Sequence, residues 1–375
     1  MELHISHIED VLPHLVDGNG IVVSDRPGYR VIDYLFTTDE TFDSAMSLQC
    51  RGLKFDESGA IIARPFHKFF NIGEREDPHT VDWSRPHLIF DKLDGSMIHP
   101  ARLAGELVFM TRMGVTGQAR AAVAFASESV LRLCNAELDA GRTPVFEYTG
   151  PENRIVVRYD AAELTLLASR ETVSGRYLGA TDLEALAREF GVPLVKSFGE
   201  VEDITGFIAD RRALEGIEGY VVAFEDGHRL KLKTDAYALR HKALSAVRLE
   251  KNVLEWVVAE AVDDVLPLLN EAEADLLRAY KRRVDASVSR IVEEVEQFHA
   301  EHGLRERKEY ALAVQADLPK HMQPAAFALL DGRSARAAVW KHLTWAAHSQ
   351  TRVDKVRLLY GLEWKADHLA EIEQG

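Results

Sequence analysis

The chain contains few cysteines, no long apolar run and no excess of positive charge. Its 375 residues include only two cysteines, Cys50 and Cys134, which excludes a disulfide framework and leaves no zinc-ligand spacing. No stretch approaches the roughly 18 consecutive apolar residues of a membrane-spanning helix, so we expect no membrane segment. Met1–Ile5 has no basic region before an apolar run, and a signal peptide is not expected. These absences favour the reducing cytoplasm.

The net charge of -15 excludes a protein that binds nucleic acid through an overall basic surface. It does not exclude an enzyme that holds one end of a strand in a local cationic groove. For such an enzyme we expect modest and salt-sensitive affinity for nucleic acid. The length exceeds that of one ordinary hydrophobic core and predicts two domains.

Over residues 1–244 short strands alternate with a few helices, which predicts an antiparallel α+β domain and not a doubly wound one. The expected strands are 51–54, 60–64, 88–90, 97–99, 106–112, 155–159, 164–169, 220–224 and 230–233, and the expected helices are 118–136 and 181–190.

Residues 245–375 predict a second domain that is all helical. The pattern indicates helices at 252–266, 271–299, 322–330, 334–345 and 366–373. Apolar residues recur every three or four positions along 271–299, and such a stripe is typical of a helix face packed in a core.

A lysine precedes an Asp-Gly turn in Phe90-Asp91-Lys92-Leu93-Asp94-Gly95-Ser96. An amine with a pKa of roughly 10.4 is protonated at neutral pH and is then no nucleophile. It becomes one where nearby cations or a metal favour loss of its proton, and other donors must hold the phosphate that it attacks. Groups of this kind occur in order along residues 50–237. Taken singly, each is more typical of a turn, a solvated strand face or a core; the ordered set favours a site.

Two further lysines, Lys231 and Lys233, alternate with leucines, so a strand would direct both to one face. A strand at 220–224 precedes them, with Asp226-Gly227 as the hairpin turn. Glu218 then lies at one end of this hairpin. A carboxylate there and two lysines opposite suit a metal-bound triphosphate.

The chain resembles the covalent nucleotidyltransferases, which comprise ATP-dependent RNA ligases, DNA ligases and mRNA capping enzymes. Within them it is most similar to the type 1 RNA ligases of T-even phages, which repair tRNA. The segments that carry the resemblance are Cys50-Arg51-Gly52, Ala63-Arg64-Pro65, Lys68-Phe69-Phe70-Asn71, Lys92-x-Asp94-Gly95, Arg112, Glu147 with Pro151-Glu-Asn153-Arg154-Ile155-Val156, Glu218-Gly219, Lys231-Leu-Lys233 and Tyr237.

The resemblance implies an antiparallel-sheet nucleotidyltransferase domain (ATP-grasp-like ligase) over 1–244, followed by an all-α domain over 245–375 that selects RNA. The implied activity joins RNA 3′-hydroxyl and 5′-phosphate ends, as in a broken tRNA, through AMP linked to a lysine. This implies ATP and Mg²⁺, or Mn²⁺, as cofactors, in the cytoplasm of a bacterium or a phage-infected host.

The implied site residues follow from the same resemblance. Lys92 is the nucleophile, and Asp94 orients its turn or a metal-bound water. Lys231 and Lys233 hold the α-phosphate. The remaining nucleotide-binding residues are Arg51, Lys68, Arg112 and Tyr237 on the β- and γ-phosphates, Glu147 on the ribose, and Phe70, Gly95 and Gly219, with Glu218 as the metal ligand.

Two other interpretations remain open. A DNA ligase or a capping guanylyltransferase would use the same lysine chemistry, but these enzymes usually append an OB-fold, and no short alternating strands follow residue 245. The Lys68–Asn71 segment also counts against both. A non-catalytic, ligase-like RNA-binding module is the second alternative, and the presence of every expected catalytic side chain counts against it. No motif indicates the wall of the adenine pocket.

Overall fold

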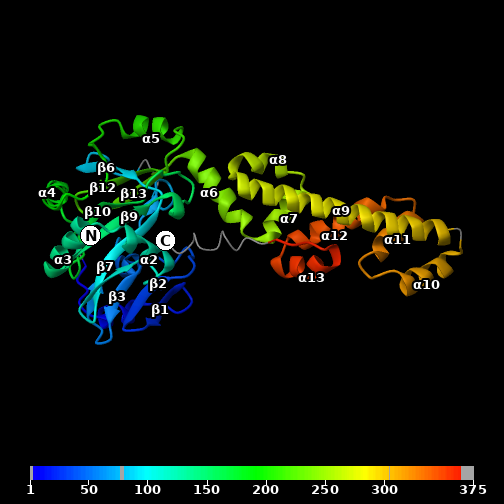
Figure 1. The fold of residues 1–375 in the computed structure, drawn as a ribbon, viewed down its shortest axis with the longest axis horizontal. Coiled ribbons are helices and arrows are strands. Elements are labelled where there is room, and N and C mark those ends of the chain that lie inside the picture. Colours follow the sequence, from blue (N-terminus) through cyan, green and yellow to red (C-terminus); the bar gives the residue numbers. More distant parts are fainter. Residues whose placement is uncertain (1–2, 77–79, 304, 365–375) are drawn as a thin grey trace. The chain divides into compact units, whose positions relative to one another are not determined.

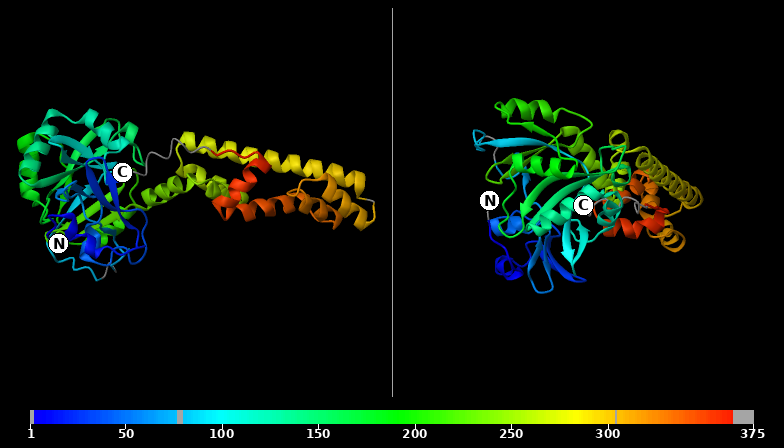
Figure 2. Two further views of the ribbon diagram at one scale, coloured as in Figure 1. Left: turned by 90° about the horizontal axis from the view of Figure 1, so that it is seen from below. Right: turned by 60° about the vertical axis from the view of Figure 1, so that its left-hand side comes forward.

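The computed structural model describes residues 3–76, 80–303 and 305–364, which form two compact units (Figure 1, Figure 2). The first contains the described residues up to Ala238, and the second begins at Leu239. The division falls inside helix α6 (Asp235–Val247), which also contains the predicted boundary at residue 244.

Three sheets form the first unit, and all of their strand pairs are antiparallel except β13–β5. The predicted α+β class is therefore confirmed. The first sheet has the order β1 (Ile21–Arg26), β2 (Tyr29–Tyr34), β3 (Leu53–Asp56), β4 (Ile61–Ala63). The second has the order β10 (Glu163–Glu171), β9 (Arg142–Thr149), β7 (Ser96–Leu103), β8 (Glu106–Met110). The third has the order β11 (Ser197–Gly199), β6 (His87–Lys92), β12 (Gly219–Phe224), β13 (Arg229–Lys233), β5 (Phe70–Asn71).

The Asp-Gly turn after Lys92 connects two of these sheets. Strand β6 ends at Lys92 in the third sheet, and β7 begins at Ser96 in the second. The register pairs Lys92 with Gly219 of β12, and Met97 with Glu147 of β9. The turn thus brings residues from both sheets to one place.

Helices cover the sheets of the first unit. Ile98, Leu133 and Phe146 are fully buried where α2, α3 and α4 pack on the second sheet. The helices of this unit are α1 (Ala45–Gln49), α2 (Gly117–Phe125), α3 (Glu128–Asp139), α4 (Ala180–Phe190) and α5 (Ile204–Arg212), with 3₁₀ turns at Ile8–Asp10, Leu12–His14 and Pro151–Asn153.

Two details of the predicted first domain are wrong. The single helix expected over 118–136 is divided, because Ser127 caps a new helix by accepting a hydrogen bond from the Val130 amide. The strand expected over 155–159 is absent, because the amides of Val156 and Val157 donate to the Asp94 carboxylate and not to a neighbouring strand.

The described part of the second unit, residues 239–364, is all helical, as predicted. Its longest helix, α9, buries the predicted apolar stripe, which includes Leu277, Val284 and Ile291. The other helices are α7 (Glu250–Val258), α8 (Val262–Val265), a 3₁₀ turn at Leu266–Leu268, α9 (Glu271–His302), α10 (Arg307–Asp317), α11 (Gln323–Leu330), α12 (Ala335–Ala347) and α13 (Gln350–Tyr360).

The helix expected over 252–266 is also divided, near Glu260, whose φ of 57° lies outside the helical region. The helix expected at 366–373 lies outside the described residues. None of the helices described in the chain is both long and apolar enough to cross a membrane.

Candidate active site

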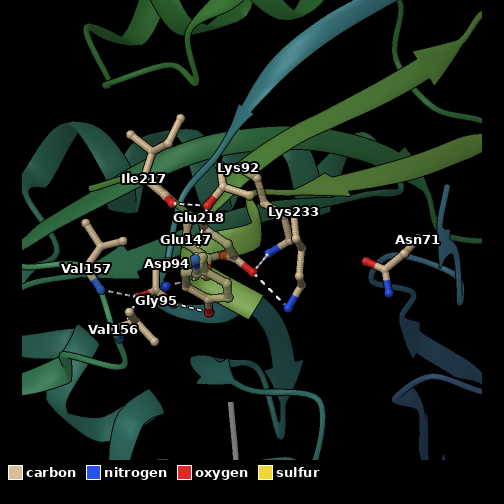
Figure 3. A network of polar contacts seen from close by, with 12 residues as sticks. Asn71, Lys92, Asp94, Gly95, Glu147, Val156, Val157, Ile217, Glu218 and Lys233 are labelled. Atoms are coloured by element: carbon tan, nitrogen blue, oxygen red, sulfur yellow. Dashed lines mark hydrogen bonds and ion pairs between the residues drawn. The ribbon is translucent and has the colours of Figure 1, made fainter. Parts of the chain in front are cut away.

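Lys92 and Glu218 form an ion pair where the second and third sheets meet. Lys92 Nζ lies 2.6 Å from Glu218 Oε1, and Lys233 Nζ lies 3.2 Å from the same oxygen (Figure 3). Burial lowers the pKa of Lys92, but the carboxylates of Glu218 and Glu147 outweigh it and raise the pKa above its ordinary value. Lys92 is therefore a protonated ammonium in this state.

Glu218 is only 4% exposed and precedes β12. Burial raises the pKa of its carboxyl, but Lys92 and Lys233 outweigh burial and lower the pKa. The carboxylate is thus ionised, and two lysines from the strands on either side of β12 share one of its oxygens. Of the two lysines predicted opposite Glu218, Lys233 forms an ion pair with it and Lys231 does not, as far as the described residues show.

Asp94 holds the turn that follows Lys92 in place. Its Oδ1 accepts a hydrogen bond from the Tyr237 hydroxyl at 2.7 Å, and its Oδ2 accepts from the amides of Val156 and Val157 at 2.7 and 2.6 Å. Because the side chain is 1% exposed and both oxygens have protein donors, its geometry suits orientation of the turn. Through the amides of Val156 and Val157, the end of the segment that begins at Pro151 supports the turn that contains Asp94.

Tyr237 was expected on the triphosphate, but its hydroxyl lies on Asp94. Burial raises the pKa of Tyr237, and Glu218 and Asp94 raise it further, so the phenol stays a neutral donor. Its ring lies 4.9 Å from Lys233 Nζ. The structure therefore places Tyr237 beside Lys233, with its hydroxyl bound to the turn that follows Lys92.

Steric contact explains why positions 95 and 219, both predicted in the site, are occupied by glycine. A Cβ at Gly95 would lie 2.2 Å from the Tyr148 carbonyl oxygen, and one at Gly219 would lie 1.9 Å from that of Leu232. The Gly95 amide donates to Glu147 Oε1 at 3.0 Å. Burial raises the pKa of Glu147 to about 8, with Glu218 and Asp94 adding to the effect and Lys92 opposing it. Glu147 is thus held close to the turn that follows Lys92.

Lys231 lies in a cluster of positive charge. Burial lowers its pKa well below the ordinary value, and Arg51, Lys92 and Lys68 act in the same direction. Its Nζ is 4.7 Å from the centre of the Phe69 ring. No carboxylate of the described residues forms an ion pair with Lys231. An anion that entered here would restore the charged form of this lysine.

Lys68 and Arg112 share an aromatic neighbour that the sequence analysis missed. The Tyr34 ring lies 5.0 Å from Lys68 Nζ and 4.4 Å from the Arg112 guanidinium carbon. Burial raises the pKa of Tyr34, but Arg51, Lys68 and Arg112 outweigh burial and lower the pKa. Tyr34 reaches these cations through sheet pairing, so no local sequence signal marks it.

Phe70 packs beside Lys68. It is not part of the wall of a small cavity that adjoins Lys92. Its ring lies 5.3 Å from Lys68 Nζ and packs edge-on against Phe42 at 6.1 Å. Lys68 and Arg112 also lie outside that cavity, whereas Arg51 lines it. The structure thus separates the predicted cations into a cavity group, which includes Arg51, and an outer group, which consists of Lys68 and Arg112.

A cavity of about 190 Å³ adjoins Lys92 and was not predicted. Its walls combine apolar side chains with the charged residues described above. The lining residues are Arg51, Phe66, Phe69, Phe90, Asp91, Lys92, Leu93, Gly95, Met97, Glu147, Leu167, Val195, Val221, Arg229 and Lys231. A larger cavity of about 780 Å³ shares Phe90, Leu167 and Arg229 with it but none of the lysines. The smaller cavity is therefore the one that adjoins Lys92 and Lys231.

A family model described as RNA ligase matches residues 49–237. RNA ligase 1 of bacteriophage TS2126 is 31% identical over 279 residues, which cover 70% of this chain and 68% of the phage protein. A relative from Thermovibrio ammonificans, whose name also refers to RNA ligase, is 29% identical over 225 residues, or 57% of this chain and 58% of that protein. The match thus spans less than two thirds of the Thermovibrio protein.

Among solved structures, an archaeal ATP-dependent RNA ligase is similar over 62% of each chain, with 19% identity and a TM-score of 0.45. The family match covers every predicted site residue from Arg51 to Tyr237, which confirms the resemblance inferred from the motifs. The chain belongs to the RNA ligase family.

Proposed function

We propose that the protein is an ATP-dependent RNA ligase that joins 3′-hydroxyl and 5′-phosphate ends through AMP bound covalently to Lys92. The observation that carries this proposal is the position of Lys92 at a cavity lined by Arg51 and Lys231. Burial and the neighbouring cations lower the pKa of Lys231, and no described carboxylate pairs with it, so a polyphosphate that entered would restore its charged form and offset the repulsion within the cluster.

ATP would place its base among the apolar walls of the 190 Å³ cavity, with Phe69 and Val221 among them. Glu147 would accept hydrogen bonds from the ribose. Lys231 and Lys233 would hold the α-phosphate. For Arg51 of the cavity group, and for Lys68 and Arg112 of the outer group, we propose contact with the β- and γ-phosphates. Tyr34 and Tyr237 would support the cations beside them.

In the first step Lys92 passes its ammonium proton to water, and the amine attacks the α-phosphorus, so that a nitrogen–phosphorus bond forms, the bond to the β-phosphate oxygen breaks and pyrophosphate leaves. In the second an RNA 5′-phosphate oxygen attacks the same phosphorus, and the lysine nitrogen departs and regains a proton. In the third an RNA 3′-hydroxyl attacks the activated 5′-phosphate, and AMP leaves. The cations hold each phosphate in line with its leaving group.

Among the residues that the structure describes, no three His, Cys, Asp or Glu side chains form a metal cluster. Mg²⁺ often needs only one or two carboxylates, because phosphate oxygens and water complete its coordination. The ionised carboxylate of Glu218 fits this requirement, and it would hold Mg²⁺ or Mn²⁺. A bound metal would supply positive charge beside the reacting phosphates.

The direct test is incubation with radiolabelled ATP or GTP and Mg²⁺, followed by addition of a 5′-phosphorylated RNA strand. We expect a labelled protein with ATP, then adenylylated RNA, then circular RNA. A protein labelled only by GTP would instead indicate a capping-type activity. A protein labelled by neither nucleotide would contradict the proposed chemistry.

Lys68→Ala should reduce formation of the protein–AMP adduct by about a hundredfold, which is typical of losing one charged phosphate ligand. Sealing of pre-adenylylated RNA should change little, because pyrophosphate has already left before that step. Single-turnover rates of both reactions would test this. Equal losses in both would assign Lys68 to RNA binding or to folding.

We also propose that the helical unit selects the RNA, with broken tRNA as the substrate. It contains no part of the site described above, and the helices after Ala238 form their own core. Shape distinguishes a structured RNA end from an unstructured one, and an extended helical surface can read shape.

A chain truncated after Leu249 should therefore still form the protein–AMP adduct but should lose its preference for a nicked tRNA stem-loop over an unstructured strand of equal length. Initial sealing rates on both RNAs would measure this preference. Thermal unfolding must show a cooperative transition, because Ala243 and Val247 pack in the helical core and become exposed. A folded truncation that kept the full preference would contradict the proposal.

A further inference from the structure

Lys54 of β3 is a buried lysine whose hydrogen bonds all end on backbone carbonyl groups. Its Nζ donates to the carbonyl oxygens of Gly52, Thr111 and Arg112, each at 2.8 Å, and the residue is 0% exposed. A protonated amine has three N–H donors, so all three are used. Because a buried charge without partners is strongly unfavourable, this ammonium favours keeping the three carbonyls together.

These carbonyls belong to two segments that come from different sheets. Gly52 precedes β3 of the first sheet, whereas Thr111 and Arg112 follow β8 of the second. Gly52 adjoins Arg51, and the other segment includes Arg112 itself. Lys54 therefore connects the backbones that carry two of the proposed phosphate ligands.

The two segments also lie in close contact. Gly52 has a φ of +84°, and a Cβ there would lie 2.7 Å from the Arg112 carbonyl oxygen and 3.0 Å from Lys54 Nζ. Only glycine fits both this conformation and this approach. The spacing between the segments thus depends on the small residue at 52 and on the ammonium at 54.

A second charge interaction fixes the Arg112 side chain. Its NH1 donates to Asp33 Oδ1 at 2.9 Å and to the Tyr34 carbonyl at 3.1 Å. Burial lowers the pKa of Lys54 to about 7; the Asp33 carboxylate opposes that effect, whereas Arg112 and Arg51 add to it. The three carbonyl acceptors at 2.8 Å favour the ammonium form. Lys54 and Asp33 together hold Arg112 beside Tyr34, from the backbone and from the side chain.

We propose that Lys54 is a positioning residue that sets the spacing of Arg51 and Arg112 and thereby the affinity for the β- and γ-phosphates of ATP. The proposal rests on the proposed function, since it assumes that both arginines face the triphosphate. Lys54 itself touches no nucleotide. Replacing Lys54 should therefore weaken the binding of ligands that carry β- and γ-phosphates. The affinity for ligands that lack these phosphates should not change.

Lys54→Met keeps the buried aliphatic stem and removes the charge. We expect binding of a non-hydrolysable ATP analogue to weaken by about tenfold to a hundredfold, and binding of AMP to stay within about twofold. The KM for ATP in adduct formation should rise in parallel, while sealing of pre-adenylylated RNA keeps its rate. Calorimetric titration measures the two affinities without requiring any turnover.

Two variants serve as controls. Leu133→Ala opens a cavity in the core beneath α3, away from these segments, and should lower the melting temperature without changing the ratio of the two affinities. Gly52→Ala pushes the same segments apart without removing a charge, and should reproduce the effect of Lys54→Met. If Lys54→Met does not fold, the affinities of Gly52→Ala for the ATP analogue and for AMP test the proposal instead.

Equal weakening of AMP and of the analogue, or no change in either, would overturn the proposal. The two hypotheses also fail separately. A wild-type protein that binds the analogue but never forms an adduct contradicts the proposed function, while its affinity ratio still tests the role of Lys54.

Discussion

Lys92→Ala should form no protein–AMP adduct, and it should still seal RNA that already carries a 5′-adenylate. The first step requires a nitrogen nucleophile, and alanine has none. The last step requires only the phosphate-binding cations and the carboxylate of Glu218, all of which remain. Gel assays with labelled ATP, and separately with pre-adenylylated RNA, would measure the two activities.

Lys196→Ala is a matched control, because Lys196 is an exposed lysine that lies over Phe198 and outside the cavity. It should behave as the wild-type protein in both assays. Labelling of Lys92→Ala by ATP would mean that another residue is the nucleophile.

Glu218→Gln should lower the rate of adenylylation by about a thousandfold, and Glu218→Ala should be no better. The amide cannot provide the negative charge that a metal ligand needs. The ion pair makes this test sharper, because glutamine also removes the interaction that raises the pKa of Lys92. If Glu218 only restrained the lysine, the glutamine variant would react faster than the wild-type protein at neutral pH.

The measurement is the single-turnover rate of adduct formation over a range of Mg²⁺ concentrations. Glu184→Gln, which changes an exposed carboxylate on α4, provides the comparison. A Glu218→Gln variant with near-normal rates would show that the side chain acts as a neutral hydrogen-bonding group.

The residues that could be predicted are those whose role depends on local sequence. Lys92, Asp94 and Gly95 lie in one turn, and Lys231 and Lys233 alternate on one strand, so their spacing predicts which of them lie together. That the two segments share a site follows only from the ordered set of motifs and from the family resemblance. The β12–β13 hairpin, by contrast, follows locally from Asp226-Gly227. Local patterns of this kind carry over directly to the folded chain.

Features that depend on pairing between distant segments could not be predicted. Tyr34 and Lys54 reach Arg112, one of the proposed phosphate ligands, only because separate sheets meet there. The cavity beside Lys92 is lined by residues from 51 to 231, and no single segment of the sequence indicates it. The mistaken strand at 155–159 has the same cause, because its amides bind a carboxylate more than 60 positions earlier in the chain.

The ion pair between Lys92 and Glu218 also affects how the resting protein meets other reagents. Cyanate, acyl phosphates and aldehydes react with free amines and hardly with ammonium groups. Because Glu218 favours the ammonium form, we expect Lys92 to react only slowly with such electrophiles while no nucleotide is bound. The lysine for which we propose the nucleophilic role is thus shielded from irreversible modification during the time it spends without a nucleotide.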